Sequence, residues 1–261
     1  MSDKIASTHE GGVAHILFNN PEKRNAVSLD MWQAVGRALD GFAADERVRV
    51  VVLSGAGDKA FVSGADISRF EQERASAEAI AHYNKTTAEV SGKLVAFPKP
   101  TIAQITGSCV GGGVALAVCC DLRICGEGSR FGIPAARLGL GYGFTGINRL
   151  VQLVGPAFAK EIFFTARLFS AAEAHGMGLV NCVVPDDQVE AYVADYAQKI
   201  TDNAPLTIGS VKAIVGEALK DPAERDLERC AALVDACYAS QDYVEGRRAF
   251  MEKRKPQFVG A

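Results

Sequence analysis

The sequence lacks the features that mark membrane, metal and nucleoside-triphosphate-binding proteins. Its most apolar run, 109–120, is too short and too rich in glycine to span a bilayer. The four histidines form no HExxH pair, and no GxxxxGK[ST] loop occurs. The N-terminal MSDKIASTHEGG is polar and has no signal-peptide core. We therefore expect a cytoplasmic protein with no metal site and no membrane partner.

Excess charge and paired cysteines are missing too. A net charge of −3 argues against a general nucleic-acid partner. The seven cysteines are odd in number and show no CxxC spacing, so we expect free thiols in a reducing compartment. Five of them lie in apolar surroundings, where packing is the preferred interpretation: Cys109, Cys119, Cys120, Cys125 and Cys182.

What remains is an ordinary globular composition, with 48% hydrophobic and 23% charged residues among 261. The first part of the chain alternates strands with helices. Val13 to Phe18 and the β-branched run Val48 to Leu53 read as strands, and Leu29 to Ala44 reads as a helix with Ser28 as N-cap. This pattern predicts the α/β class.

Helices dominate the rest of the chain. A charged, exposed helix is expected over 68–96, two helices over 146–154 and 158–166, and almost entirely helical structure after Val189. Asp221-Pro222 and Ser240 mark breaks in this last part. We expect an α/β core over 1–200 and a helical module over 201–261.

The most informative stretch is TIAQITGSCVGGGVALAVCCD, from Thr101 to Asp121. It reads as a strand, a turn at Gly111, Gly112 and Gly113, and an apolar helix. The N–H groups that begin a helix have no intrahelical partner and lie at the positive end of its dipole. Such a turn suits a developing negative oxygen, although for a lone GGG tight packing is the preferred interpretation.

A second loop favours anion binding over tight packing as the role of this turn. It follows the 48–53 strand, and loops at the carboxyl ends of parallel strands are where α/β proteins bind ligands. Gly64 would let the chain turn so that the N–H of Ala65 faces a pocket, and Asp66 would accept loop N–H groups. Two donors converging on one carbonyl make an oxyanion hole, in which each contributes about 3–4 kcal/mol.

Five segments together give a specific resemblance: NNPEKRNAVS, KAFVSGADI, KPTIAQITGSCVGGGVALAVCCDLRI, SRFGIPAARLGLG and AFMEKRKPQF. In their order and spacing the chain resembles the crotonase, or enoyl-CoA hydratase/isomerase, superfamily over nearly its whole length. The resemblance implies an α/β fold with a crotonase-like ββα spiral core and a helical C-terminal trimerisation module. It also implies an acyl-CoA thioester as ligand, no cofactor beyond the coenzyme A of the substrate, and a homotrimer or dimer of trimers.

The resemblance assigns roles to single residues. The N–H groups of Ala65 and Gly112 would bind the thioester oxygen and stabilise an enolate. Arg24 and Ala26 would lie near the CoA nucleotide, while Phe250 and Lys253 would reach the CoA of a neighbouring subunit. The expected substrate-binding residues are Arg24, Ala26, Gly64, Asp66, Ile67, Gly111, Arg137, Phe250 and Lys253.

Two departures from the family pattern bear on the reaction. Family hydratases carry one glutamate in the helix after GGG and another after the FGxP segment, where this chain has Ala115 and Ala135. A positioned acid or base contributes about 10²–10⁴ in rate. Without either group, efficient syn-hydration of an enoyl-CoA is not expected.

Decarboxylation of a malonyl-type thioester would form the enolate directly, without a base. LGLGYGFTGINRL, TDNAPLTIGSVK and the C-terminal twenty residues are similar to the methylmalonyl-CoA decarboxylase branch, and Tyr142 falls on an active-site tyrosine of that branch. The match is incomplete, because that branch has histidine where Ala65 stands and glutamate where Ala115 stands. We favour decarboxylase-like lyase chemistry with Tyr142 as a catalytic candidate.

Several alternatives remain open. The chain could be a hydratase or isomerase with an unrecognised base, or a CoA-ester binder without activity. A nucleotide-dependent oxidoreductase would rest on GxGxxG at 141–146, but no firm strand leads into it. Arg137 could bind a second carboxylate, although a surface ion pair is preferred. His82 and Tyr83 are expected to face solvent.

Overall fold

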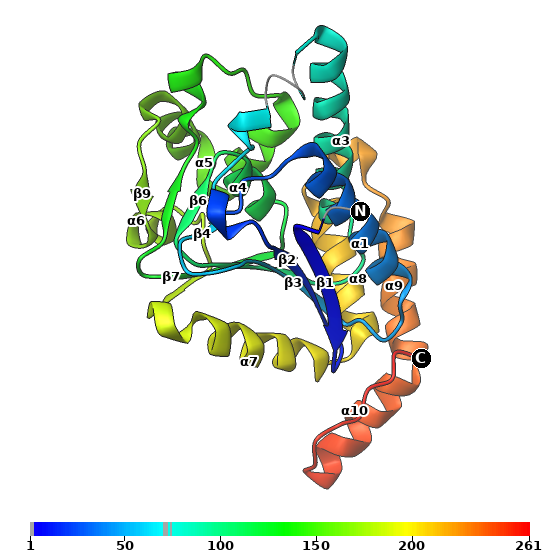
Figure 1. Cartoon of the computed structure of the whole chain (residues 1–261). Coiled ribbons are helices and arrows are strands. Elements are labelled where there is room, and N and C mark those ends of the chain that lie inside the picture. The colour runs from blue at the N-terminus through cyan, green and yellow to red at the C-terminus, as the bar shows by residue number, and fades with distance from the viewer. Residues whose placement is uncertain (1–2, 70–72, 74) are drawn as a thin grey trace.

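The structure is a computed structural model that describes residues 3–69, 73 and 75–261 (Figure 1). Its main sheet has the strand order β1-β2-β3-β5-β7-β10. The strands are β1 (Ile5–Glu10), β2 (Val13–Phe18), β3 (Val50–Gly55), β5 (Thr101–Ile105), β7 (Leu122–Gly126) and β10 (Cys182–Val184). The β1–β2 pair is antiparallel and the other pairs are parallel.

A smaller sheet has the order β4-β6-β8-β9. Its strands are β4 (Ala60–Val62), β6 (Ser108–Val110), β8 (Arg130–Gly132) and β9 (Phe169–Ser170). The chain alternates between the two sheets: β3 leads to β4, β5 to β6 and β7 to β8, and a helical segment follows each pair. This repeated unit confirms the predicted ββα spiral.

Helices surround the two sheets (Figure 1). The core helices are α1 (Leu29–Ala44), α3 (Ala77–Val95), α4 (Gly112–Ala117), α5 (Phe144–Thr165), α6 (Ala171–Gly176) and α7 (Val189–Thr201). Short 3₁₀ turns are η1 (Pro21–Lys23), η2 (Ile67–Arg69), η3 (Pro134–Leu138), η4 (Asp186–Gln188) and η5 (Pro222–Glu224). The β-branched strand β3 is buried on both faces, because α7 packs on Val50 and Val52 while Val51 and Leu53 belong to the larger core.

The C-terminal part consists of α8 (Pro205–Ala218), α9 (Leu227–Ala239) and α10 (Gln241–Glu252). Breaks occur where the sequence predicts them, at η5 and at Ser240, which ends α9 and caps α10. In Figure 1, α10 projects away from the spiral core. No helix within the described ranges is long and apolar enough to cross a membrane.

Some local expectations are corrected. The strand β1 was not predicted, and the helix expected over 68–96 begins only at Ala77, with residues 70–72 and 74 outside the described ranges. The two helices expected over 146–154 and 158–166 are confirmed as the two halves of α5, which meet at a break in helical geometry at Gly155, whose φ is 73°.

The start of α1 differs from the expectation as well. Ser28 occupies the N-cap position, but its hydroxyl bonds the carboxylate of Asp30 and no helix N–H. The first helix amide, the N–H of Leu29, instead donates to the carboxylate of Glu73 (3.2 Å). A long-range contact therefore takes over the role of the local cap.

Candidate active site: two backbone donors

The three glycines at the start of α4 have different roles. A Cβ on Gly113 would lie 2.0 Å from the carbonyl oxygen of Val62, so this glycine lets α4 pack directly on β4. Gly111 is the N-cap, with φ of 55°. A Cβ on Gly112 would meet only ordinary contacts, the nearest being the backbone nitrogen of Ala65 at 3.7 Å. Tight packing therefore accounts for Gly113, and Gly112 faces the second predicted donor.

The loop that carries Ala65 is held by a parallel bridge to Val27. The N–H of Val27 donates to the carbonyl oxygen of Gly64 (2.8 Å), and the N–H of Asp66 donates to the carbonyl oxygen of Val27 (3.0 Å). In a parallel bridge the residue between two such bonds turns its own N–H away from the partner strand. The Ala65 N–H is therefore directed away from Val27, and Gly64 allows this turn with φ of 115°.

Gly112 is the first residue of α4, so its N–H has no intrahelical acceptor. In the part of the chain that the structure describes, neither this N–H nor that of Ala65 donates to a protein acceptor. Two unpaired N–H groups from distant segments thus lie at one place beside a helix N-terminus. An oxyanion hole also requires that both N–H groups point at one substrate oxygen.

Asp66 fixes the far side of this loop. Its side chain is 4% exposed and accepts from the N–H of Ser68 (3.2 Å), the hydroxyl of Ser68 (2.6 Å) and the ammonium of Lys23 (2.9 Å). Burial would raise the pKa of Asp66, but the bonds from Ser68 and Lys23 outweigh it and the pKa is lowered. The expectation that Asp66 accepts a loop N–H is confirmed.

Replacement of Lys23 by methionine tests this support. We expect Lys23→Met to lower the free energy of unfolding at neutral pH by about 1–3 kcal/mol, since Asp66 then lacks its cation. The folded pKa of Asp66 lies below its unfolded value, so its stabilising contribution is complete above roughly pH 4 and is lost as the pH falls through the folded pKa. Denaturant titrations from neutral to acidic pH should therefore show the two proteins converging; a difference that stays constant would contradict the assignment.

The other predicted binding residues lie in two groups. Arg24 is exposed and Ala26 buried in the loop that bridges to Ala65, and the carbonyl oxygen of Arg24 accepts from the N–H of Ser63 (3.1 Å). Ile67 is 62% exposed just after the donor loop. Phe250 and Lys253 belong to the end of α10, which Figure 1 places far from α4. One chain alone does not bring these two residues to the donors.

The candidates for proton transfer are few. Ala115 is half-buried in α4, and Ala135 is buried in η3. Tyr142 packs its ring edge-on against Phe163, with 5.0 Å between ring centroids. Arg137 is exposed, and no ion pair joins it to any residue the structure describes, so the surface ion pair preferred from the sequence is absent there. The two alanine positions leave the site without a carboxylate at either family location.

Three further expectations are settled by burial and local structure. Cys109 is fully buried, which raises the pKa of its thiol well above the usual range and supports packing over nucleophilic chemistry. His82 is exposed as expected, but Tyr83 is buried in α3 and the solvent-facing prediction for it was wrong. At 141–146 the glycines follow η3 and lead into α5, without the strand that a dinucleotide site needs.

Comparison with known proteins places the whole chain in one family. The model of the family described as "Enoyl-CoA hydratase/isomerase" matches residues 8–261. The chain belongs to the enoyl-CoA hydratase/isomerase family. A crotonyl-CoA hydratase of Syntrophomonas wolfei is 35% identical over 98% of both chains, and a short-chain-enoyl-CoA hydratase of Clostridium acetobutylicum is 34% identical over 94% of both.

Solved structures of the family superpose closely on this chain. An enoyl-CoA hydratase/carnithine racemase from Magnetospirillum magneticum gives a TM-score of 0.93 at 37% identity, covering 100% of this chain and 97% of its own. The enoyl-CoA hydratase from Bacillus anthracis gives 0.90 at 31% identity, covering 99% and 100%. The whole chain thus has the family fold.

Proposed function

We propose that this family member binds an acyl-CoA thioester with its carbonyl oxygen between the N–H groups of Ala65 and Gly112, and that it stabilises the enolate formed there. The observation that carries the proposal is the position of Gly112, whose Cβ would lie 3.7 Å from the nitrogen of Ala65. Negative charge that develops on the oxygen is stabilised by donors already in place, without reorganisation. The thioester itself becomes acidic at its α-carbon, so the chemistry needs no redox group.

The two alanines favour a reaction that needs no carboxylate base. When a malonyl-type thioester loses CO₂, the electron pair of the broken C–C bond becomes the enolate, and only a proton is needed afterwards. Ala115 and Ala135 fit this requirement, since neither can activate water. We therefore favour decarboxylase-like lyase chemistry over hydration, with Tyr142 as the candidate for orienting a substrate carboxylate or a proton donor.

Hydration by an unrecognised base is the competing function, because the matched relatives are named as hydratases. A binder of CoA esters without catalysis is the third possibility. The three are separated by incubating the pure protein with methylmalonyl-CoA, malonyl-CoA and crotonyl-CoA and following products by mass spectrometry. We expect loss of CO₂ from a malonyl-type thioester and little hydration. Rapid hydration of crotonyl-CoA would contradict the lyase proposal, and inertness toward a broad thioester panel would favour the binder.

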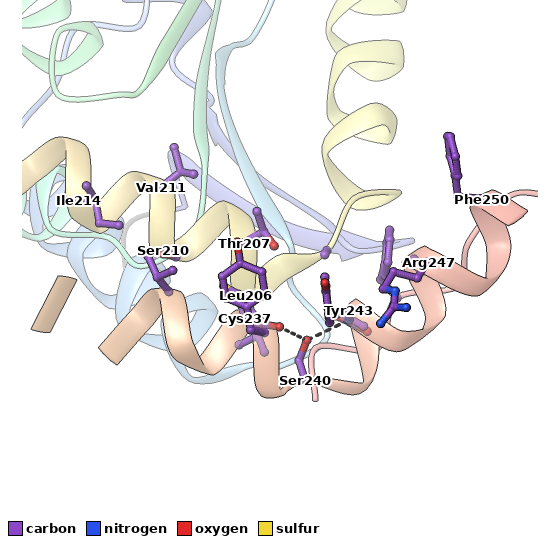
Figure 2. Close-up of a pocket in the computed structure, with 16 residues that line it drawn as sticks. Leu206, Thr207, Ser210, Val211, Ile214, Cys237, Ser240, Tyr243, Arg247 and Phe250 are labelled. Carbon is purple, nitrogen blue, oxygen red and sulfur yellow. Dashed lines mark hydrogen bonds between the residues drawn. The ribbon is translucent and has the colours of Figure 1, made fainter. Parts of the chain in front are cut away.

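We also propose that the chain works as a homotrimer or a dimer of trimers. A cavity of about 650 Å³ opens between α8, α9 and α10. Figure 2 shows its apolar and aromatic lining, with Val211 from α8, Tyr243 and Phe250 from α10, and Cys237 from α9. Val211 is 56% and Phe250 83% exposed. Exposed apolar surface of this kind supports contact with further copies, which would bring Phe250 and Lys253 toward a neighbour's CoA.

A charge placed in the cavity between α8, α9 and α10 should break the proposed trimer. We expect Val211→Glu to leave the protomer folded, since the side chain is 56% exposed, but to yield monomers by analytical ultracentrifugation. Binding of CoA thioesters should weaken at the same time, because Phe250 and Lys253 would no longer reach a neighbour. Lys85→Glu, at an exposed position of α3, serves as a charge-changing control. Unchanged oligomers in the Val211 variant would contradict this interface.

A further inference from the structure

The loop from Asn20 to Val27 contains one side chain whose surroundings are unusual, that of Asn25. It is 0% exposed, and its backbone is left-handed, with φ of 56°. Asparagine tolerates this conformation better than most residues. Its carbonyl oxygen accepts from the N–H of Asn20 (2.9 Å), and its amide nitrogen donates to the carbonyl oxygens of Ala56 (3.0 Å) and Ala60 (2.7 Å).

These bonds join two parts of the chain that frame the candidate site. Ala56 directly follows β3 and Ala60 begins β4, so the amide of Asn25 fixes the connection that leads to the donor loop. Gly55 makes room for it, because a Cβ there would lie 2.6 Å from the amide nitrogen of Asn25. The side chain thus holds the 20–27 loop against the connection between β3 and β4.

The backbone of the same loop then holds Ala65. The carbonyl of Arg24 accepts from Ser63, and Val27 forms both bonds of the bridge that directs the Ala65 N–H away from it. Asn25 lies between these two contacts. A shift of the 20–27 loop would therefore move residues 63–66 together, while Gly112, which begins α4, has separate support from β6 and β8.

We propose that Asn25 is a positioning residue for the Ala65 donor, an inference that rests on the oxyanion hole proposed above. Asn25 touches no substrate in this account and acts through Val27. Oxyanion donors must lie about 2.7–3.1 Å from the oxygen, and a displacement of about 1 Å can cost about 10²-fold in rate. Loss of the Asn25 amide should therefore weaken one donor and leave the other in place.

The test uses Asn25→Asp, which keeps the shape but presents oxygen to two carbonyls, and Asn25→Gly, which keeps the left-handed backbone without a side chain. Thr101→Val is the matched control, because it removes a fully buried hydroxyl bonded to Asp121 at the start of β5. Butyryl-CoA labelled at the thioester carbon is the probe. Isotope-edited infrared spectra report how strongly its carbonyl is polarised. Amide hydrogen exchange measures how well the Asp66 N–H, which closes the bridge to Val27, is protected from solvent.

The wild-type protein should shift the carbonyl band to lower frequency. Both Asn25 variants should lose at least half of this shift and expose the Asp66 amide, whereas Thr101→Val should keep both despite lower stability. Turnover of the thioester identified by the substrate panel should fall about 10²-fold. A full band shift in either folded Asn25 variant would overturn the positioning role alone, and no shift in the wild type would overturn the oxyanion hole itself.

Discussion

Gly112→Ala should abolish most turnover of an acyl-CoA substrate while the protein stays folded. The added methyl carbon would lie 3.7 Å from the nitrogen of Ala65 and would meet no closer neighbour, so the fold can accept it. It would, however, enter the space that a thioester oxygen needs about 3 Å from both nitrogens. Interference with one such donor costs about 10²–10³ in kcat. Steady-state kinetics with the substrate from the thioester panel would measure this loss.

Gly41→Ala provides the matched control for this substitution. Gly41 lies inside α1, and a Cβ there would meet nothing within 4 Å. Alanine should therefore raise helix stability by about 0.5–1 kcal/mol and leave turnover unchanged. If Gly112→Ala retains full activity, the thioester oxygen does not enter between these two nitrogens.

Restoring the missing carboxylates should create hydration. We expect Ala115→Glu combined with Ala135→Glu to raise the rate of crotonyl-CoA hydration by about 10²–10⁴, the usual contribution of a positioned acid or base. Ala115 lies one turn into the helix that begins at Gly112 and is half-buried, so a longer side chain is not excluded there by full burial. Ala135 is 5% exposed, and the second glutamate will cost some stability. Mass spectrometry of the hydrated thioester measures the gain.

The glutamine pair at the same positions separates proton transfer from changes in size. Ala115→Gln with Ala135→Gln has nearly the same shape but cannot act as a base, and it should hydrate no faster than the wild type. Equal gains from both pairs would mean that pocket shape limits the reaction. A wild-type protein that already hydrates crotonyl-CoA rapidly would show that another group supplies the base.

The spacing of apolar and β-branched residues along the chain was enough to predict much of the fold. The helix Leu29–Ala44 and the strand Val13–Phe18 have the bounds expected from apolar spacing. The β-branched run Val48 to Leu53 predicted a strand, which the structure places at Val50–Gly55, and α7 covers its second face. Glycine turns also singled out Ala65 and Gly112, and the structure places these two backbone segments in contact, while their role as donors stays a prediction.

Features that depend on distant partners could not be derived in this way. The strand β1 is mostly polar and exposed, and only its pairing with β2 identifies it. The cap of α1 comes from Glu73, and the support of Ala65 comes through Asn25, both from contacts across the chain. Tyr83 did have a local signal, since it shares a helical stripe with Val90 and Leu94.

The most direct test is a crystal structure of this protein with butyryl-CoA, which has the thioester carbonyl but no double bond to hydrate. We predict that the carbonyl oxygen lies about 3 Å from the backbone nitrogens of both Ala65 and Gly112. An oxygen bonded to only one of them, or bound elsewhere while both N–H groups face water, would contradict the account.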